Sequence, residues 1–445
     1  MSVESFPGAI GAAEPAATSA ITATPATPTV GIVGMGYVGL PTAVSLTEAG
    51  IAVIGLDSNA DRLRRVATGQ VDLPAQDRAR LLLEMRTGRL RLTGEADALV
   101  EADVILVCVP TPVDENLEPD PRILRSACDA VVARARPGQT FVLTSTTYVG
   151  STREMLVEPL ARRGLIAGED VFVVFSPERI NPGAVEHTQS TTPRVVGGAT
   201  DLCANRASGV LRHSCEQIHR VRSLEAAEMT KLYENTFRAV NIALAFEMAD
   251  ACHHYGLDPI EVTEAAATKP YAFMAHYPSA GVGGHCIGVD PYYLLRPLRT
   301  AGTPAKMTER ALEIVSARPE RVARRAKELV ERVHGATAGA RVLIVGVAYK
   351  PGVADVREAP AVHVIAALAD SGAHVEYFDP LVPRLELGGR AYEHTPVPDA
   401  ASYDLVVVAT IHPDTDYGWL PASAHLLDCT HRAPGGRLRF VVSDA

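Results

Sequence analysis

The sequence predicts an α/β protein in which two Rossmann-like, doubly wound domains are joined by a central helical domain with one long helix. Three observations carry this prediction. A glycine-rich motif follows a strand-like stretch near residue 34, the strand pattern restarts in the last third of the chain, and residues 222–255 contain neither glycine nor proline. Strands that alternate with helices are typical of nucleotide-binding domains. After a disordered tail over residues 1–28, the expected units are residues 29–220, 221–319 and 320–445.

The composition limits the class of protein. The chain has 445 residues, of which 47% are hydrophobic, and its formal net charge is −10. This length suffices for two or three domains, and an acidic balance without a Lys/Arg block argues against a nucleic-acid surface. The seven cysteines form no CxxC pair, which indicates neither a disulfide framework nor a zinc site and fits a reducing compartment. Because neither a secretory signal nor a run of about 18 apolar residues occurs, we expect a cytoplasmic protein without a membrane segment.

The first domain should begin with the strand-like stretch 29–33, which leads into Gly34-x-Gly36-x-x-Gly39 and a helical pattern. In such a motif the first glycine permits a tight turn, the second lets a pyrophosphate approach, and the third lets the helix pack closely. A second strand ends at Asp57, near the spacing of roughly 20 residues at which an acid accepts the ribose hydroxyls. The acid favours NAD over NADP. A purely structural glycine turn is the alternative.

Three further apolar runs, 102–109, 140–143 and 171–175, are typical of buried parallel strands. The first should place its following loop in the cofactor crevice. The other two lead to Thr146 and Glu178. Because ligands of open α/β sheets bind outside the carboxyl ends of the strands, both side chains are expected where chemistry can occur. The alternative is that they are ordinary turn or capping residues.

Residues 222–255 predict a helix of about 50 Å, long enough to join two domains and to pack against another subunit. We therefore expect a homodimer through this central long helix. Lys231, Asn235 and Arg238 fall at i, i+4 and i+7 and so form a polar stripe on one face. A solvated face is the alternative. Asn235 lies among apolar neighbours, however, and a buried amide needs a partner, which favours a site.

The stretch 281–294 has three early glycines, Gly281, Gly283 and Gly284, that lead directly to Cys286 and then to Asp290. Glycines let a backbone approach a ligand closely, and a cysteine thiolate beside a group that accepts its proton can act as a nucleophile. The alternative is that Cys286 is a buried apolar residue beside a turn.

The last third of the chain echoes the first domain. Strand patterns at 341–346, 372–379 and 403–409 parallel those at 29–34, 50–57 and 102–109. The GxGxxG motif is absent, so we expect no second dinucleotide in this domain. Lys350 and Arg357 in its first loop could meet phosphates or a carboxylate. The scattered histidines and acids have no metal-ligand spacing, so no metal is expected.

From Val30 to about His431 the chain resembles the UDP-glucose/GDP-mannose dehydrogenase family. Six ordered motifs carry the resemblance: Gly34-Met35-Gly36-Tyr37-Val38-Gly39-Leu40-Pro41, Val109-Pro110-Thr111-Pro112, Ser176-Pro177-Glu178-Arg179, Lys231 with Asn235, Gly283-Gly284-His285-Cys286 with Asp290, and Tyr349-Lys350 through Asp355 and Arg357. The segments 176–183 and 284–294 are most similar to the branch that oxidises UDP-N-acetylhexosamines. The segment 277–281 and Val149 depart from the usual family pattern.

The resemblance implies an NAD-dependent, four-electron oxidation of a UDP-sugar at C6. Cys286 would form a thiohemiacetal and then a thioester, Lys231 and Asn235 would stabilise oxyanions, and Asp290 would support proton transfer. Thr146 and Glu178 would position the hydrolytic water. The resemblance further implies NAD contacts from Gly34, Gly36, Tyr37, Val38, Gly39, Asp57, Pro110, Thr111, Thr146 and Arg357. Substrate contacts are implied for Glu178, Arg179, Lys231, Asn235, Arg238, Gly281, Gly283 and Lys350.

The preferred sugar is expected to carry a 2-acetamido group. Glucose-oxidising relatives typically have a second acid four positions after the first glutamate, where this chain has Pro182. An apolar wall there suits an acetyl methyl, and UDP-N-acetylglucosamine is the first choice. The alternatives are a UDP-glucose 6-dehydrogenase, a two-electron β-hydroxyacid dehydrogenase that does not need Cys286, and a non-catalytic nucleotide-sugar sensor.

Overall fold

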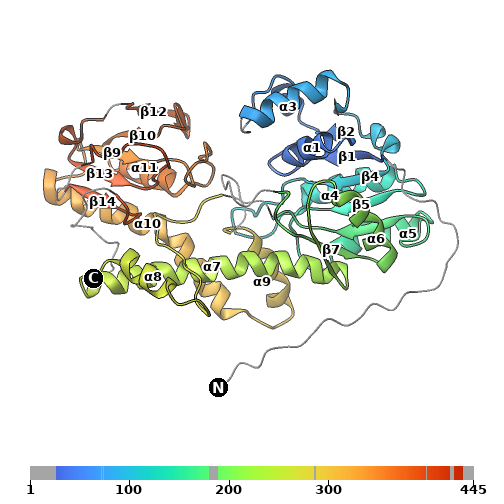
Figure 1. Cartoon of the computed structure of the whole chain (residues 1–445). Coiled ribbons are helices and arrows are strands. Elements are labelled where there is room, and N and C mark those ends of the chain that lie inside the picture. Colours follow the sequence, from blue (N-terminus) through green and yellow to red (C-terminus); the bar gives the residue numbers. More distant parts are fainter. Residues whose placement is uncertain are drawn as a thin grey trace.

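The computed structural model describes residues 27–71, 73, 75–179, 189–284, 287–396, 398–420 and 425–433. Two sheets made mainly of parallel strands lie at opposite ends of a central helical region (Figure 1). The predicted fold class is therefore confirmed. No helix among the described residues is both long enough and apolar enough to cross a membrane.

The part of the N-terminal sheet that the structure describes has eight strands in the order β3-β2-β1-β4-β5-β6-β7-β8. All adjacent pairs are parallel except β6 and β7. The strands are β1 (Thr29–Val33), β2 (Ala52–Leu56), β3 (Leu90–Thr93), β4 (Val104–Val107), β5 (Thr140–Leu143), β6 (Phe172–Phe175), β7 (Arg194–Gly198) and β8 (Ile218–Val221). The helices around them are α1 (Gly39–Glu48), α2 (Ala60–Ala67), α3 (Ala75–Arg86), α4 (Arg122–Ala133), α5 (Glu158–Arg162) and α6 (Asp201–Leu211).

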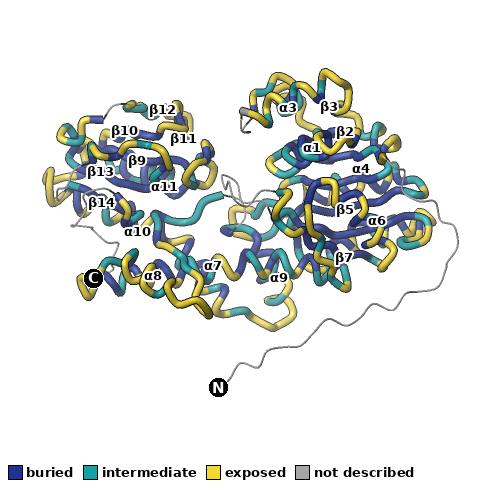
Figure 2. The backbone as a smooth tube through the Cα atoms, viewed as in Figure 1, coloured by how far each residue is buried: buried dark blue, intermediate teal, exposed yellow. Residues whose placement is uncertain are grey.

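Both faces of this sheet are covered, which explains its uninterrupted apolar strands. Successive side chains of a strand point to opposite faces. In β4, Val104 and Leu106 join the cluster that contains residues of α1, α3 and α6. Ile105 and Val107 join the opposite cluster, which contains residues of α4 and α5. Figure 2 shows the central strands as a buried layer.

The central region consists of α7 (Leu224–His254), α8 (Pro259–Ala267), α9 (Asp290–Thr300) and the first part of α10 (Lys306–His334). Ser223 caps α7, because its side chain accepts a hydrogen bond from the amide of Ala226. Gly256, with a φ of +69°, lies just beyond the other end. The long helix predicted from residues 222–255 is confirmed, and α7 runs beneath both domains (Figure 1).

One helix runs through a proline. Helix α10 starts at Lys306 and continues through Pro319. Proline removes one backbone donor and usually ends or kinks a helix. Tertiary packing outweighs this cost, because α10 packs against both α7 and α11. A domain boundary between residues 319 and 320 therefore lies inside a continuous helix.

Within the described residues, the C-terminal sheet has six strands in the order β11-β12-β10-β9-β13-β14. They are β9 (Arg341–Val345), β10 (His374–Phe378), β11 (Leu385–Leu387), β12 (Arg390–His394), β13 (Leu405–Val408) and β14 (Leu426–Asp428). Only β11 and β12 pair antiparallel. The helices α10 and α11 (Pro360–Asp370) cover one face, whereas Tyr417, Trp419 and Leu420 pack over the other.

Candidate active site

The glycine-rich turn after β1 has the shape that a dinucleotide requires. Gly34 has a φ of +95°, and a Cβ there would lie 2.6 Å from the carbonyl oxygen of Cys108. A Cβ on Gly39 would lie 1.9 Å from the carbonyl oxygen of Gly34, so α1 starts directly against the turn. A Cβ on Gly36 would meet nothing within 4 Å. The turn therefore exposes its middle glycine, beside the N-terminus of α1, and these residues fit a pyrophosphate.

Asp57, at the end of β2, is tied to this turn. One carboxylate oxygen accepts a hydrogen bond from the amide of Met35 at 2.9 Å, and the other accepts one from the amide of Asn59 at 2.9 Å. Sequence reasoning missed Arg62, whose Nε donates to the carbonyl oxygen of Met35 at 2.6 Å. Burial is the main cause that lowers the pKa of Arg62, and the nearby charge of Asp57 opposes it. A carboxylate and a guanidinium therefore lie beside the same turn.

The predicted residues after β4 and β5 lie at the same edge of the sheet. Pro110 is exposed, and Thr111 and Thr146 are partly buried. Ser145 fastens the two loops together, because its hydroxyl accepts from the amide of Val109 at 2.9 Å and donates to the Val109 carbonyl at 2.8 Å. This serine was not singled out from the sequence, although its place between a buried strand and Thr146 was a usable signal.

Four of the six predicted catalytic residues meet at the junction of α7, α9 and the loop after β6. Lys231 Nζ donates to the carbonyl oxygen of Glu178 at 3.0 Å. Asn235, which is 3% exposed, donates from its side-chain amide to the carboxylate of Asp290. Asp290 is also 3% exposed, so its carboxylate lies in a dry environment beside Asn235.

Burial raises the pKa of Asp290 to about 6, although the charge of Lys231 and the hydrogen bond from Asn235 oppose this shift. A carboxylate with this pKa exchanges a proton readily near neutral pH. The sequence allowed two alternatives for Asn235, a solvated helix face or a binding site. Its amide is buried and hydrogen-bonded to a charged group. The arrangement of Lys231, Asn235 and Asp290 can therefore bind and protonate an oxygen.

Residues close to Glu178 hold its carboxylate in place. One oxygen accepts from the amide of Arg179 at 2.8 Å, and the other accepts from Gln189 Nε2 at 3.2 Å. Arg194 Nη1 lies 3.5 Å from this second oxygen, and the Arg194 side chain is only 4% exposed. Sequence reasoning missed Arg194, although a charged residue at the start of the apolar strand β7 was a usable signal.

Arg179 lies on another side of this loop. Its guanidinium forms a two-point ion pair with Glu234 of α7, with Nη2 and an Oε1 atom 2.7 Å apart. Its Nη1 also donates to the carbonyl oxygen of Pro193 at 2.7 Å. These contacts use the guanidinium to join the loop to α7, so its predicted contact with the substrate stays a prediction.

Arg238 and Lys350 come together from different parts of the chain. Arg238 lies one helical turn beyond Asn235 on α7 and is exposed. Lys350 lies in the loop after β9, and its pKa is lowered mainly by burial and also by the charge of Arg238. An anion bound beside both side chains would offset the repulsion between their charges.

The glycines of the stretch 281–284 pack against the C-terminal domain. A Cβ on Gly281 would lie 2.9 Å from Pro319, and one on Gly283 would lie 2.6 Å from the carbonyl oxygen of Glu358. The ring of Tyr349 would lie 3.1 Å from a Cβ on Gly284. The close approach that the sequence assigned to a ligand is thus made to protein. Cys286, the predicted nucleophile, lies outside the described residues, as does Pro182.

A direct contact joins the two nucleotide-type domains. The guanidinium carbon of Arg357 lies 4.1 Å from the centre of the Tyr37 ring, which belongs to the glycine-rich turn. Asp355 holds Arg357 in place through a two-point ion pair, with Nη2 and an Oδ2 atom 2.8 Å apart. Two residues predicted to contact NAD thus meet across the domains.

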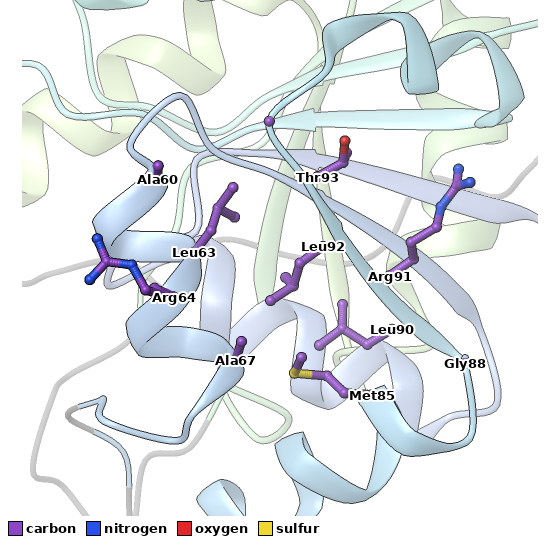
Figure 3. Close-up of a pocket in the computed structure, with 11 residues that line it drawn as sticks. Ala60, Leu63, Arg64, Ala67, Met85, Gly88, Leu90, Arg91, Leu92 and Thr93 are labelled. Atoms are coloured by element: carbon purple, nitrogen blue, oxygen red, sulfur yellow. The ribbon is translucent and has the colours of Figure 1, made fainter.

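One groove on the described surface lies away from these residues. It has a volume of about 660 Å³ and lies between α2 and β3, where Leu63, Met85 and Leu92 line it (Figure 3). None of its lining residues belongs to the predicted site. Among the residues that the structure describes, no group of three or more His, Cys, Asp or Glu side chains is placed to hold a metal ion.

Comparisons with known proteins show the family of this chain. Three models of the UDP-glucose/GDP-mannose dehydrogenase family match in order: the NAD binding domain over residues 28–214, the central domain over residues 225–316 and the UDP binding domain over residues 343–430.

Two curated relatives match most of the chain. The chain is 34% identical to UDP-N-acetyl-D-glucosamine 6-dehydrogenase of Pseudomonas aeruginosa, over 86% of this chain and 90% of the relative. It is 32% identical to UDP-N-acetyl-D-mannosamine dehydrogenase of Pyrococcus horikoshii, over 86% and 88%. A solved structure of UDP-D-ManNAc dehydrogenase from Pyrococcus horikoshii matches with a TM-score of 0.82 at 30% identity, covering 93% of this chain and 99% of that chain.

Proposed function

The chain belongs to the UDP-glucose/GDP-mannose dehydrogenase family and is an NAD-dependent nucleotide-sugar dehydrogenase, and from this premise we propose that it oxidises the C6 alcohol of a UDP-N-acetylhexosamine to a carboxylate. The observation that carries the proposal is the meeting of Lys231, Asn235 and Asp290 beside Glu178. A cation, an amide and a carboxylate with a raised pKa are the groups that an alcohol oxidation needs.

NAD is the cofactor, and the turn at Gly34 and Gly36 with Asp57 at the end of β2 would hold it. When bound, NAD supplies the hydride acceptor for each of the two oxidations. Tyr37 and Arg357 would enclose it, because their stacked side chains join the turn to the C-terminal domain. Pro110, Thr111 and Thr146 would line the same crevice from the neighbouring strand ends.

The UDP-sugar would bind between α7 and the C-terminal domain, which matches the UDP binding domain of the family. Lys350 and Arg238 support this assignment, because both side chains are cationic and the charge of Arg238 acts on Lys350. Together they suit a diphosphate. The sugar would then extend toward Lys231 and Asn235, one to two helical turns before Arg238 on the same helix. Its C6 hydroxyl would meet Asp290.

In the first oxidation, Asp290 accepts the hydroxyl proton and a C6 hydrogen leaves as hydride, which gives the aldehyde, while Lys231 and Asn235 stabilise the oxygen as negative charge develops on it. The thiol of Cys286 then adds to the aldehyde carbon, and the aldehyde oxygen takes a proton. The second oxidation removes the C6 hydrogen as hydride and the hydroxyl proton, which leaves a thioester. Water, held by Glu178 and Thr146, adds to the thioester carbon. The carbon–sulfur bond breaks, and the acid and the thiol are released.

The family branch supports a 2-acetamido sugar, because the two curated relatives are named for UDP-N-acetyl-D-glucosamine and UDP-N-acetyl-D-mannosamine. We assign UDP-N-acetylglucosamine as the preferred substrate. The preference for an acetamido group over a hydroxyl rests on the apolar Pro182 where glucose-oxidising relatives have a second acid, since an uncharged wall suits an acetyl methyl.

The protein is proposed to act as a homodimer through α7. An apolar stripe runs along this helix at Met229, Tyr233, Phe237, Leu244 and Met248, and all five side chains are exposed. Tyr233 is 68% exposed and Met248 is 50% exposed. A continuous apolar face of this length is typical of a subunit interface, and a twofold axis would cover both copies of it at once.

One assay tests the reaction and its substrate together. The NADH formed per sugar is counted with UDP-glucose and with the gluco, galacto and manno forms of UDP-N-acetylhexosamine. We expect two NADH per sugar and the highest kcat/KM with UDP-N-acetylglucosamine. One NADH per sugar would refute the four-electron oxidation. A higher kcat/KM with UDP-glucose would refute the acetamido preference and leave the family assignment intact.

A further inference from the structure

The loop after β9 touches two parts of the proposed site. This loop, residues 346–352, carries Lys350, whose pKa responds to the charge of Arg238 on α7. It also carries Tyr349, whose ring lies 3.1 Å from where a Cβ on Gly284 would stand. A displacement of the loop would therefore move a proposed diphosphate contact and the support of the glycine stretch before Cys286 together.

A buried histidine lies beneath this loop. His412, which follows β13, has a side chain that is 1% exposed. Its Nδ1 lies 3.0 Å from the amide nitrogen of Gly352, and its Nε2 lies 3.1 Å from the carboxylate of Asp379. A backbone amide can only donate, so Nδ1 must be the acceptor and Nε2 must carry the proton. The two hydrogen bonds thus fix one neutral tautomer of His412.

Asp379 grips the other end of the same loop. Its side chain is fully buried, and one oxygen accepts hydrogen bonds from the amides of Val347 at 2.8 Å and Ala348 at 3.1 Å. The other oxygen accepts from the amide of Leu381 at 2.9 Å. The pair therefore holds the loop at both ends, through Asp379 near its start and through His412 at Gly352.

The first domain has a related arrangement with a different outcome. Asp57 ends β2 as Asp379 follows β10, and each accepts a hydrogen bond from an amide of the glycine turn after the neighbouring strand. Asp57 is only partly buried, whereas Asp379 is buried against His412. The carboxylate of Asp379 is buried and fully hydrogen-bonded, so it has no accessible oxygen for a ribose. Its hydrogen bonds hold the loop instead.

We infer that His412 is a positioning residue for substrate binding, which accepts the hydrogen bond from Gly352 in the tautomer that Asp379 fixes and so holds the Lys350 loop in its binding conformation. This inference rests on the proposed contact of Lys350 with the diphosphate of the UDP-sugar. His412 itself touches no substrate, because it is buried beneath the loop. Its effect should appear in the affinity for UDP and not in the affinity for NAD, whose turn lies in the other domain.

Three variants separate its two hydrogen bonds. In His412→Asn the side-chain oxygen lies as many bonds from Cα as Nδ1 does, so it can accept from Gly352. In His412→Gln the amide nitrogen corresponds to Nε2, so it can donate to Asp379 only. His412→Ala removes both bonds. The dissociation constants of UDP and of NAD are measured by calorimetry for the full-length variants, together with their Tm and with Lys350→Ala.

We expect UDP to bind about tenfold more weakly to His412→Ala and to His412→Gln, a loss of about one hydrogen bond of 1.4 kcal/mol. His412→Asn should stay within about threefold of the parent, and NAD should bind all variants as it binds the parent. Equal UDP affinity in His412→Gln and the parent would overturn the inference, as would an equal loss in His412→Asn and His412→Gln. If His412→Ala does not fold, the comparison of Asn with Gln decides. If Lys350→Ala binds UDP like the parent, the proposed role of Lys350 is overturned and the His412 variants test the loop alone.

Discussion

At the scale of single residues, the site depends on side chains whose properties burial has changed. Asp290 is a carboxylate in a dry environment, and the charge of Lys231 and the amide of Asn235 only partly offset the cost of its ionisation. Asn235 is an amide that would be costly to bury without Asp290. Each of the three therefore explains why the others can be there, and changing one alters the protonation or orientation of the rest.

The raised pKa of Asp290 sets a pH dependence for the reaction. Since the proposed base must be ionised, kcat should rise with pH through about 6, and Asp290→Asn should lower kcat by roughly a hundredfold or more. The measurement is kcat over about three pH units, from about pH 5 to about pH 8. A parent profile without an acidic limb near that value would contradict the role of Asp290 as base.

The same group affects stability in a direction that can be checked. Its folded-state pKa lies above the ordinary value, so the native state binds a proton more readily than the unfolded chain does. The stability that this provides is present at low pH and is lost as the pH rises from about 4 through about 6. The Tm of Asp290→Asn minus the Tm of the parent should therefore increase as the pH rises over this range. A constant difference in Tm would show that the carboxyl group is not perturbed.

The proposed nucleophile has a direct test. Replacing Cys286 with serine should stop the reaction before the acid, because an alkoxide is much harder to form than a thiolate. The rate of the complete oxidation is expected to fall about a thousandfold or more, while the dissociation constant of NAD stays unchanged. NADH per sugar and calorimetry with NAD measure the two quantities. Two NADH per sugar at the parent rate would refute covalent catalysis by Cys286.

Cofactor choice is expected to depend on Asp57. Its carboxylate repels a 2′-phosphate, so kcat/KM should be at least about tenfold higher with NAD than with NADP. In Asp57→Ala the ratio should narrow strongly, because Arg62 remains beside the same turn and can attract a phosphate. Initial rates with both cofactors measure the ratio. A ratio that is the same in parent and variant would exclude Asp57 from this role.

At the scale of elements, strands deliver the site residues and close packing fixes where the loops lie. The loops after β4, β5 and β6 meet at one edge because their strands are parallel neighbours. Their mutual position depends on contacts such as that between Ser145 and Val109. The glycine stretch 281–284 is placed in a different way, by its fit against Tyr349, Glu358 and the prolines of α10 and α11.

This fit offers a matched pair of variants. A Cβ on Gly283 would lie 2.6 Å from the backbone oxygen of Glu358, whereas a Cβ on Gly288 would meet nothing within 4 Å. Gly283→Ala should displace the stretch from the C-terminal domain and lower kcat/KM by about tenfold or more, since overpacking typically costs about 1–3 kcal/mol. Gly288→Ala is the control and should stay within about twofold of the parent. Equal kinetics in both variants would mean that the packing of Gly283 does not support activity.

At the scale of the whole molecule, the helices α7 and α10 join the two nucleotide-type domains, and the Tyr37–Arg357 contact spans them. Both domains thereby contribute to both predicted sites, since Arg357 of the C-terminal domain is predicted to contact NAD and Glu178 of the N-terminal domain is predicted to contact the UDP-sugar. The outward face of α7 carries the exposed apolar stripe at residues 229–248. Catalytic and association surfaces thus share one helix.

This stripe predicts the oligomeric state. Tyr233→Asp combined with Met248→Asp should convert a dimer to a monomer, because two charges would be buried against the apolar face of the partner. Leu202→Asp, at an exposed apolar position on α6, is the control and should leave the dimer intact. Light scattering after gel filtration measures the mass. A parent that is monomeric at micromolar concentration would rule out the interface.

The sequence by itself determined the features that depend on local patterns. Buried parallel strands need apolar residues on both faces, a dinucleotide turn needs its three glycines, and a helix as long as α7 needs a stretch free of glycine and proline. Those requirements concern residues that are close together in the sequence. The fold class, the cofactor and the choice of Lys231, Asn235 and Asp290 as candidate site residues could therefore be predicted.

Only the tertiary structure decided which partners these residues meet. The continuation of α10 through Pro319, the pairing of Arg179 with Glu234 and the support of the Lys350 loop by His412 all depend on contacts between segments far apart in the chain. No local pattern records such contacts, because the free energy of burying a charge or crossing a proline depends on what the rest of the fold brings beside it.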